Sequence, residues 1–297
     1  MSEHSSYHHG EVSLQGAIVG LAQNYVGSNN INLLEPIGQF GSRNMGGKDH
    51  ASARYIFTSL NPVTRFIFRE EDDQLLKYLD DDGLIVEPEW YLPIIPMVLV
   101  NGCSGIGTGW ATDIPQYNPR DIVKALKAKI EHDTDFPDLT PFWKGWTGTL
   151  EQNGGSYISR GKYHIDKAND VIEITELPVR KWTRDYKLII EKLMEEGEDK
   201  SAVEDMLEYH TTRNVHFKLK LGDYMGNKLA NSGVAEQYFK MAGSFSVKNL
   251  VGWDSNIAIK RYENVQEIMN YFYPIRLKYY GLRKDYLISV LERDRML

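Results

Sequence analysis

The sequence predicts an α+β fold, because stretches of its 297 residues carry either helical or strand-like apolar patterns. Between residues 14 and 25, apolar side chains recur every three or four positions, which places them on one face of a helix. Residues 143–177 contain β-prone pieces separated by turn residues. From residue 264 onward the apolar spacing is helical again. Helices near both ends and strands between them are therefore expected.

The composition is that of a globular chain long enough for two domains, with 42% hydrophobic and 25% charged residues. The longest apolar run, residues 91–100, is short and contains two prolines, so no membrane span or membrane partner is expected. The only cysteine, Cys103, excludes an internal disulfide and fits a reducing compartment.

The net charge of -7 argues against a protein that binds nucleic acid over its whole surface. Its distribution is uneven. Residues 1–69 carry five basic and four acidic side chains, and residues 260–297 carry eight basic and five acidic ones. The acidic excess therefore lies in the middle of the chain, where a solvated face is the simplest interpretation. A local DNA contact near the N-terminus is allowed.

The first predicted helix follows the sequence Tyr7-His8-His9-Gly10-Glu11 and should end at Gly27 in a left-handed cap. Its apolar face would comprise Leu14, Ile18, Leu21 and Tyr25. His8 and His9 would then lie at the helix N-terminus, where free N–H groups and the helix dipole favour a phosphate. A structural role is the alternative for this pair. Adjacent histidines make a poor metal site because their side chains diverge.

A glycine-rich stretch, residues 36–49, precedes Arg54 and Tyr55. Its four glycines let backbone N–H groups approach an anion closely. It also contains side chains that can meet phosphate: Arg43, Asn44 and Lys48.

Arg54 and Tyr55 follow that stretch and are the candidate catalytic pair. A phenol with a pKa of about 10 needs help to act as a nucleophile. A neighbouring guanidinium can stabilise negative charge on phosphate oxygens in the transition state. Because the chain has 18 tyrosines, an ordinary strand tyrosine is the alternative. Residues 56–58 are β-prone, so we expect Tyr55 at the edge of a rigid element.

Two acidic clusters, residues 70–73 and 80–82, allow a magnesium hypothesis because carboxylates bind this ion. Acidic surface turns ending at Gly83 are the favoured interpretation. No further carboxylate motif supports a metal site in this sequence.

Residues 96–110 are expected to form an apolar strand that opens into a glycine-rich loop. The last glycine of a dinucleotide fingerprint would fall on Trp110, and no Gly-Lys-Ser/Thr follows, so nucleotide-binding loops of both common kinds are excluded. Ile106 is a bulky residue between two glycines. Packing into a core is its ordinary role.

The remaining elements are predicted from caps and apolar spacing. Asn118 and Pro119 should begin a helix with an apolar face of Ile122, Leu126 and Ile130. The other predicted elements are a strand at 171–175, a helix at 183–197, a helix starting near Ser201, a strand at 217–221 and a helix from Asn264. Pro274 would kink that last helix or begin a new one.

Five blocks in fixed order carry a resemblance to a known family. They are SSYHHGEVSL, PIGQFGSRNMGGKDHASARYIFT, IPMVLVNGCSGIGTGWATDIP, ELPVRKWTRDY and RLKYYGLRKDYL. Together they closely resemble the DNA breakage-and-reunion region of eukaryotic DNA topoisomerase II, from about residue 5 to the end of the chain. Gyrase and topoisomerase IV of bacteria resemble it less.

The resemblance implies three parts. Residues 1–60 would be a partial, N-terminally truncated winged-helix DNA-binding domain that carries the catalytic tyrosine. Residues 61–262 would be an α/β tower domain, and residues 263–297 would begin a coiled-coil helical arm towards the C-terminal gate.

The resemblance also implies roles for individual side chains. Tyr55 would be the nucleophile that forms a 5′-phosphotyrosine link, Arg54 the transition-state stabiliser and His9 a contact to the scissile phosphate. The other implied DNA-binding residues are His8, Arg43, Lys48 and Ile106. Ile106 would be the side chain that intercalates between base pairs and bends the duplex.

At the level of the whole enzyme, the resemblance implies an ATP-dependent type II topoisomerase in the nucleus. It would act as a homodimer on double-stranded DNA, with Mg²⁺ and ATP bound outside this segment, which alone is expected to be inactive. A non-catalytic DNA-bending module and an acidic protein-interaction scaffold are the alternatives. The scaffold predicts no DNA affinity at any salt, whereas the other two predict binding that weakens with salt.

Overall fold

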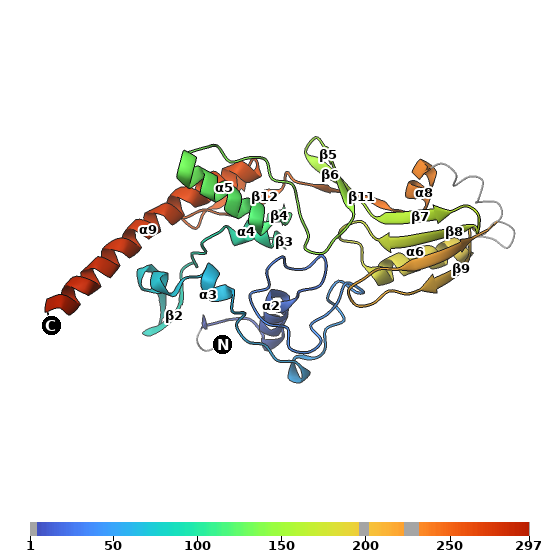
Figure 1. The fold of residues 1–297 in the computed structure, drawn as a ribbon. Coiled ribbons are helices and arrows are strands. Elements are labelled where there is room, and N and C mark those ends of the chain that lie inside the picture. The colour runs from blue at the N-terminus through green and yellow to red at the C-terminus, as the bar shows by residue number, and fades with distance from the viewer. Residues whose placement is uncertain (1–4, 196–201, 223–231, 297) are drawn as a thin grey trace.

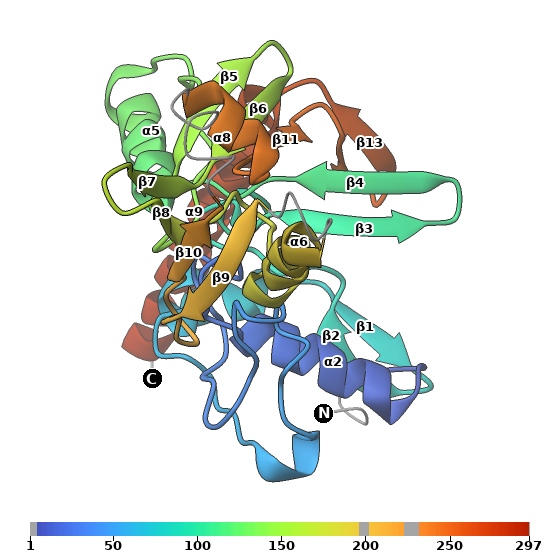
Figure 2. The ribbon, with the colours of Figure 1, turned by 90° about the vertical axis from the view of Figure 1, so that its right-hand side faces the viewer.

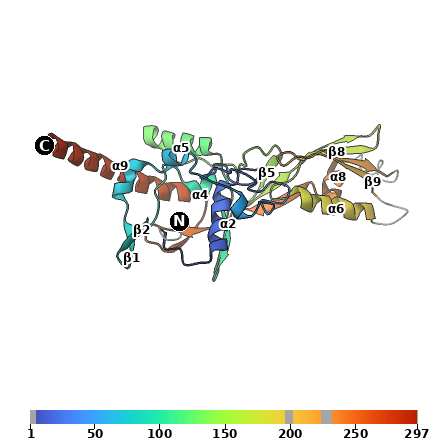
Figure 3. The ribbon, with the colours of Figure 1, turned by 90° about the horizontal axis from the view of Figure 1, so that it is seen from below.

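The computed structural model describes residues 5–195, 202–222 and 232–296. The chain is elongated (Figures 1 and 3). A long C-terminal helix, α9 (Val265–Met296), extends to one end, and a four-stranded sheet lies at the other. The N-terminal segment lies between them, on the lower side in Figure 1. The α+β prediction is confirmed.

The first helix, α2 (Glu11–Ala22), ends earlier than the sequence predicted. Gly27 has a positive φ of 97°, but it lies five residues beyond the helix and is not its cap. The Asn29 amide explains the early end, because it donates to the carbonyls of Gly20 and Gln23 at 2.7 and 2.9 Å. These bonds satisfy carbonyls that a longer helix would otherwise pair.

Residues 53–88 form short elements. They are the 3₁₀ turns η1 (Ala53–Tyr55) and η2 (Glu70–Leu75), helix α3 (Thr64–Ile67), and strands β1 (Tyr78–Asp81) and β2 (Leu84–Pro88). The acidic residues 80–82 are exposed and lead into the turn at Gly83, as the sequence predicted. Asp72 departs from that prediction, because it is buried.

The apolar run at 96–100 is a short helix, α4 (Met97–Val100), so the predicted strand is wrong. The Pro96 carbonyl accepts hydrogen bonds from the N–H groups of Leu99 and Val100, whose side chains enter the core. The following glycine-rich residues are a hairpin of β3 (Cys103–Gly107) and β4 (Trp110–Ile114) instead of a loop.

Helix α5 (Pro119–His132) begins where the sequence placed it. The Asn118 side chain accepts a hydrogen bond from the N–H of Arg120 at 2.9 Å, which is the expected cap. Ile122 and Leu126 are buried, whereas Ile130 is 61% exposed. This helix and α9 share one core with α4 and β4.

The far end of the molecule contains two antiparallel sheets. The four-stranded sheet has the order β7-β8-β10-β9, and the three-stranded sheet has the order β11-β6-β5. Their strands are β5 (Thr149–Asn153), β6 (Ser156–Arg160), β7 (Lys162–Asp166), β8 (Val171–Glu176), β9 (Val203–Glu208), β10 (Phe217–Leu221) and β11 (Ala242–Ser246). The predicted strands at 171–175 and 217–221 are confirmed.

Helices α6 (Thr183–Glu195) and α8 (Ser232–Tyr238) belong to the same end. Tyr186 and Ile190 of α6 lie in a core with the four-stranded sheet. The predicted helix at 183–197 is confirmed as far as Glu195, and its last residues lie outside the described ranges, as does Ser201. The helix predicted to start near Ser201 is wrong, because the chain is strand β9 from Val203.

Strands β12 (Leu250–Trp253) and β13 (Ile259–Tyr262) lead into α9. Asn264 caps the helix by accepting a hydrogen bond from the N–H of Glu267 at 2.8 Å. Pro274 lies inside one continuous helix and does not begin a new one. Among the described helices, none combines the length and apolar character that a bilayer crossing requires.

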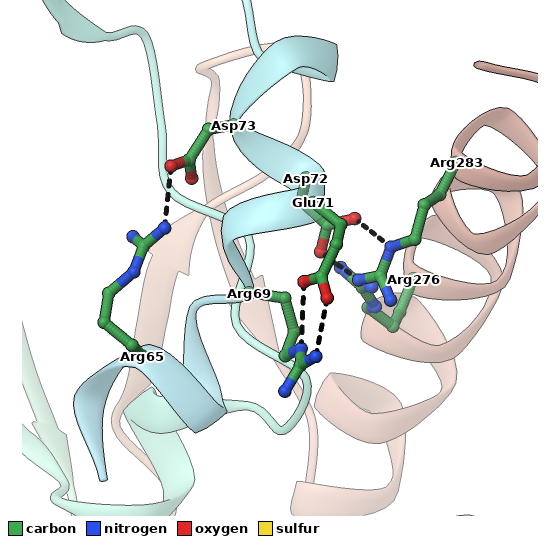
Figure 4. A network of polar contacts seen from close by, with 7 residues as sticks. All are labelled: Arg65, Arg69, Glu71, Asp72, Asp73, Arg276 and Arg283. Atoms are coloured by element: carbon green, nitrogen blue, oxygen red, sulfur yellow. Dashed lines mark hydrogen bonds and ion pairs between the residues drawn. The ribbon is translucent and has the colours of Figure 1, made fainter. Parts of the chain in front are cut away.

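A buried ion-pair network ties η2 to α9 (Figure 4). Asp72 accepts hydrogen bonds from Arg276 at 2.7 Å and from two nitrogens of Arg283 at 2.6 and 2.7 Å. Tyr280 lies beside both guanidinium groups, 4.0 Å from that of Arg276. The network fixes the first half of the long helix against the segment that follows the N-terminal part.

Candidate active site

Arg54 and Tyr55 form an exposed pair on the 3₁₀ turn η1, which protrudes on the lower side of the molecule (Figures 1 and 2). The turn is closed by a hydrogen bond from the N–H of Tyr55 to the carbonyl of Ser52 at 2.9 Å. Tyr55 is 66% exposed, and the Arg54 guanidinium lies 4.9 Å from the centroid of its ring. Both polar groups are therefore accessible to a large ligand.

The residues after Tyr55 hold the turn in place, although not as a regular strand. Phe57 forms an isolated antiparallel bridge with Ile37, through N–H···O bonds of 2.9 and 3.1 Å. Ile56 packs against a small core that includes Val19 and Ala22 of α2. The predicted rigid support is present as a bridge and an apolar contact.

The glycine-rich stretch before the pair is packed between α2 and α6. The Gln23 side chain donates to the carbonyls of Phe40 and Gly47 at 3.0 and 3.2 Å. Gly46 has a φ of 60°, and a side chain there would overlap the Trp182 indole. The glycine at this position allows close packing, which differs from the anion-binding role that the sequence suggested.

The N-terminus of α6 also holds this loop. The N–H groups of Thr183 and Arg184 donate to the carbonyls of Arg43 and Asn44 at 3.3 and 2.9 Å. These are donors that a helix start leaves without intrahelical partners. The loop that leads to Tyr55 is thus held by the far end of the molecule.

Arg43 departs from its predicted role as a DNA contact. Its guanidinium is buried and forms an ion pair of 2.5 Å with Glu176, which is buried as well. Glu176 also accepts hydrogen bonds from the N–H and hydroxyl of Thr147. In this structure Arg43 joins the loop to β8, and its side chain is almost entirely shielded from solvent. Lys48, in contrast, is exposed.

His8 and His9 are exposed and immediately precede α2, whose N-cap is Gly10. Gly10 provides no side-chain cap, so first-turn N–H groups of α2 lack a capping partner from that residue. The His9 ring makes an edge contact with Tyr7 at 5.4 Å. Helix α2, which follows these histidines, and η1 both lie on the lower side of the molecule (Figures 1 and 2).

Ile106 is the most exposed apolar side chain of the β3–β4 hairpin, at 93%. It therefore does not plug a core. Figure 2 shows the hairpin projecting from the body of the protein on the side where α2 begins. A bulky apolar side chain in that position is available to a partner.

Burial separates Tyr55 from the other tyrosines near the site. Tyr25 is partly buried beside the glycine-rich loop, and this burial, with the nearby Asp49 carboxylate, raises its pKa to about 12. Burial raises the pKa of Tyr117 and Tyr186 as well. Tyr117 and Tyr186 are buried and Tyr25 is partly buried, whereas Tyr55 is exposed to solvent.

The described part of the chain contains no group of three or more His, Cys, Asp or Glu side chains suited to a metal ion. These described residues therefore offer no magnesium site, and the resemblance implied one outside this segment.

The sequence did not reveal one interaction near Ile106. Arg180 and Asp113 form a bidentate ion pair of 2.7 and 2.6 Å, although 67 residues separate them along the chain. Both residues lie in blocks that carry the family resemblance, but the sequence does not indicate that they pair, and only the tertiary structure brings them together.

Comparisons with known proteins show the family to which the chain belongs. The family model that describes the A-type subunit of DNA gyrase/topoisomerase IV matches residues 2–296. The chain is 46% identical to DNA topoisomerase 2 of Candida albicans over 100% of this chain and 20% of that protein. It is 47% identical to DNA topoisomerase 2-beta of Homo sapiens over 98% of this chain and 18% of that protein.

A solved structure shares the fold. The crystal structure of the Plasmodium falciparum topoisomerase II DNA-binding, cleavage and re-ligation domain superposes with a TM-score of 0.93 at 44% identity. The match covers 99% of this chain and 40% of that one. The chain spans about a fifth of the length of the curated relatives quoted above.

Proposed function

The chain belongs to the DNA gyrase/topoisomerase IV family of A-type subunits, and from this premise we propose that it is the tyrosine-bearing part of a type II DNA topoisomerase. The observation that carries the proposal is the exposed Arg54–Tyr55 pair, on a turn that is held from both sides. An exposed phenol beside a guanidinium suits attack on a DNA phosphodiester.

The proposed chemistry is a transesterification. The Tyr55 oxygen bonds to phosphorus as the bond to the 3′ oxygen breaks. The phenol proton leaves to solvent or to a nearby base, and the departing 3′ oxygen takes up a proton from solvent. The products are a 5′-phosphotyrosine and a free 3′ hydroxyl, and the reverse reaction reseals the strand. Because one phosphodiester replaces another, cleavage itself needs no ATP.

Four side chains have proposed supporting roles. Arg54 stabilises the charge on the pentavalent phosphorus, and His9 contacts the scissile phosphate from the start of α2. Lys48 is exposed and binds a neighbouring phosphate, with His8 close to the same strand. Arg43 is omitted from this set because it is buried against Glu176.

The whole-enzyme properties are also part of the proposal. We place the protein in a homodimer that cuts both strands, passes a second duplex through the gap and thereby changes supercoiling and decatenates DNA. ATP and Mg²⁺ would bind outside this segment, and the enzyme would act in the nucleus during chromosome segregation. The described residues alone are expected to bind DNA weakly and to cleave it poorly.

A cleavage-trapping assay tests the proposal. The chain is joined to the metal-binding portion of a close relative, incubated with end-labelled duplex and Mg²⁺ or Ca²⁺, and quenched with detergent. Covalent label on the wild type and none on Tyr55→Phe is the expected result. If neither protein retains label while both bind DNA, the catalytic proposal fails and the DNA-bending module replaces it.

A further inference from the structure

The β3–β4 hairpin presents Ile106 at its exposed end, yet the hairpin has only two strands. An isolated two-stranded hairpin is marginal in water and does not hold a fixed direction. Something in the protein must therefore orient it. The supports lie along β4, on the strand opposite Ile106.

One support consists of hydrogen bonds from β4 to the backbone of residues 249–251. The Thr112 hydroxyl donates to the carbonyl of Val251 in β12 at 2.7 Å and accepts from the N–H of the same residue at 3.3 Å. The N–H of Asp113 donates to the carbonyl of Asn249 at 2.9 Å. These contacts fix one edge of β4 against residues 249–251.

The second support is the Arg180–Asp113 pair. Both Asp113 carboxylate oxygens accept a hydrogen bond from the Arg180 guanidinium, at 2.7 and 2.6 Å. A bidentate pair fixes the plane of the two groups as well as their distance. The Arg180 guanidinium also lies 5.6 Å from the ring centroid of Phe245, which is buried in a separate aromatic core.

The backbone of Arg180 strengthens this interpretation. Arg180 has a φ of 64°, a conformation that a residue with a long side chain seldom adopts. It lies in the segment between β8 and α6, which joins the four-stranded sheet to the helix whose first N–H groups hold the loop before Tyr55. The pair thus connects the hairpin to the elements that hold the catalytic turn.

We propose that Arg180 and Asp113 are positioning residues, which orient the β3–β4 hairpin so that Ile106 enters a DNA base step in register with Tyr55. This inference rests on the proposed function. The pair is 42% and 30% exposed, and such pairs contribute little to folding stability. Its contribution is to the direction of the hairpin, not to the fold.

A direct phosphate contact by Arg180 is the competing role. The two roles predict different effects when the Asp113 carboxylate is removed. If Arg180 binds phosphate, removing the neighbouring carboxylate frees the guanidinium and strengthens DNA binding. If the pair orients the hairpin, removing either partner impairs bending, and exchanging the two side chains restores it.

The experiment measures DNA bending by fluorescence transfer between the ends of a short duplex bound to the full-length protein. Apolar wedges kink DNA by roughly 20–90°, which such a duplex resolves. The variants are Asp113→Asn, Arg180→Gln and the exchange Asp113→Arg with Arg180→Asp. Aspartate tolerates positive φ better than most residues, so the exchange suits the backbone. Glu208→Gln, which breaks the remote Lys187–Glu208 pair of similar exposure, is the matched control.

When the duplex bends, fluorescence transfer between its ends increases. We expect both single variants to lose most of this gain and to resemble Ile106→Ala. Their melting temperatures should equal that of the wild type, Glu208→Gln should bend normally, and the exchange should restore most of the gain. Normal bending by Asp113→Asn, or by Ile106→Ala, would overturn the proposal. So would an exchange variant that folds but fails to bend. The Tyr55→Phe trapping assay remains a separate test of the catalytic proposal.

Discussion

The buried carboxylate of Asp72 provides a quantitative test of how the N-terminal half is held to the long helix. Its side chain is 3% exposed, and the Arg276 side chain that it pairs with is 4% exposed. Two further nitrogens of Arg276 have no hydrogen-bond partner among the described residues. Asp72 therefore supplies the negative charge that makes burial of Arg276 tolerable (Figure 4).

Asp72→Ala should cost about 3–5 kcal/mol, because it leaves a buried guanidinium without its partner. For a chain of this size, that loss corresponds to a fall in melting temperature of roughly 5–8 °C. The matched control is Asp73→Ala at the adjacent position. Asp73 pairs with Arg65, but both side chains are more than a third exposed, so the expected cost is at most about 1 kcal/mol.

Thermal and urea unfolding, followed by circular dichroism, would measure both variants. Loss of the Asp72 contact should melt the α9 signal first, because the network joins that helix to η2. Equal and small effects of the two alanine substitutions would refute the reasoning. The double variant Asp72→Ala with Arg276→Met should recover part of the lost stability, since it removes the unpaired charge.

Three further predictions follow from individual contacts. Burial alone would raise the pKa of Asp72, but hydrogen bonds from Arg283 and Arg276 outweigh it and lower the pKa below its usual value. The ionised carboxylate therefore stabilises the fold. This contribution is complete above the unfolded pKa and is lost as pH falls through the lower folded pKa. Acid titration of unfolding below about pH 4 should show a stability loss in the wild type that Asp72→Asn lacks, and parallel curves would contradict it. Gly46→Ala should destabilise the protein by about 1–3 kcal/mol in a urea titration, because the new side chain overlaps the Trp182 indole. Gly154→Ala is the control and should cost less, because Gly154 has a similar φ of 59° but open space around it. Equal costs would exclude the packing argument. Asn118→Ala should cost about 1 kcal/mol because it removes the α5 cap, whereas Asn118→Asp should retain the cap. An unchanged urea midpoint for the alanine variant would contradict a stabilising role for this cap.

The elements that the sequence predicted well have local causes. Helix α5 begins at a capping asparagine followed by proline, and strand β10 shows strict alternation of buried and exposed residues. Both signals depend only on neighbours along the chain. Arg54, Tyr55 and Ile106, to which the resemblance assigned roles, are exposed, whereas core packing was the ordinary role expected of Ile106.

The elements that the sequence missed depend on distant partners. Helix α2 ends early because Asn29 folds back onto its carbonyls, and Arg43 is buried because Glu176 lies opposite it. The run at 96–100 is too short and apolar to distinguish helix from strand by periodicity. Asp72 looked like one member of an acidic surface turn, since its arginine partners are more than 200 residues away. Tertiary contacts of this kind leave no pattern in a single sequence.

The most direct test of the central claim is to identify the amino acid that carries DNA in the trapped complex. The chain is joined to the metal-binding portion of a close relative, and the complex is formed on labelled duplex. The complex is digested with nuclease and protease, and the modified peptide is sequenced by mass spectrometry. We predict a nucleotide joined through its 5′ phosphate to the peptide that contains Tyr55. A nucleotide on any other residue, or a link through a 3′ phosphate, would contradict the proposed chemistry.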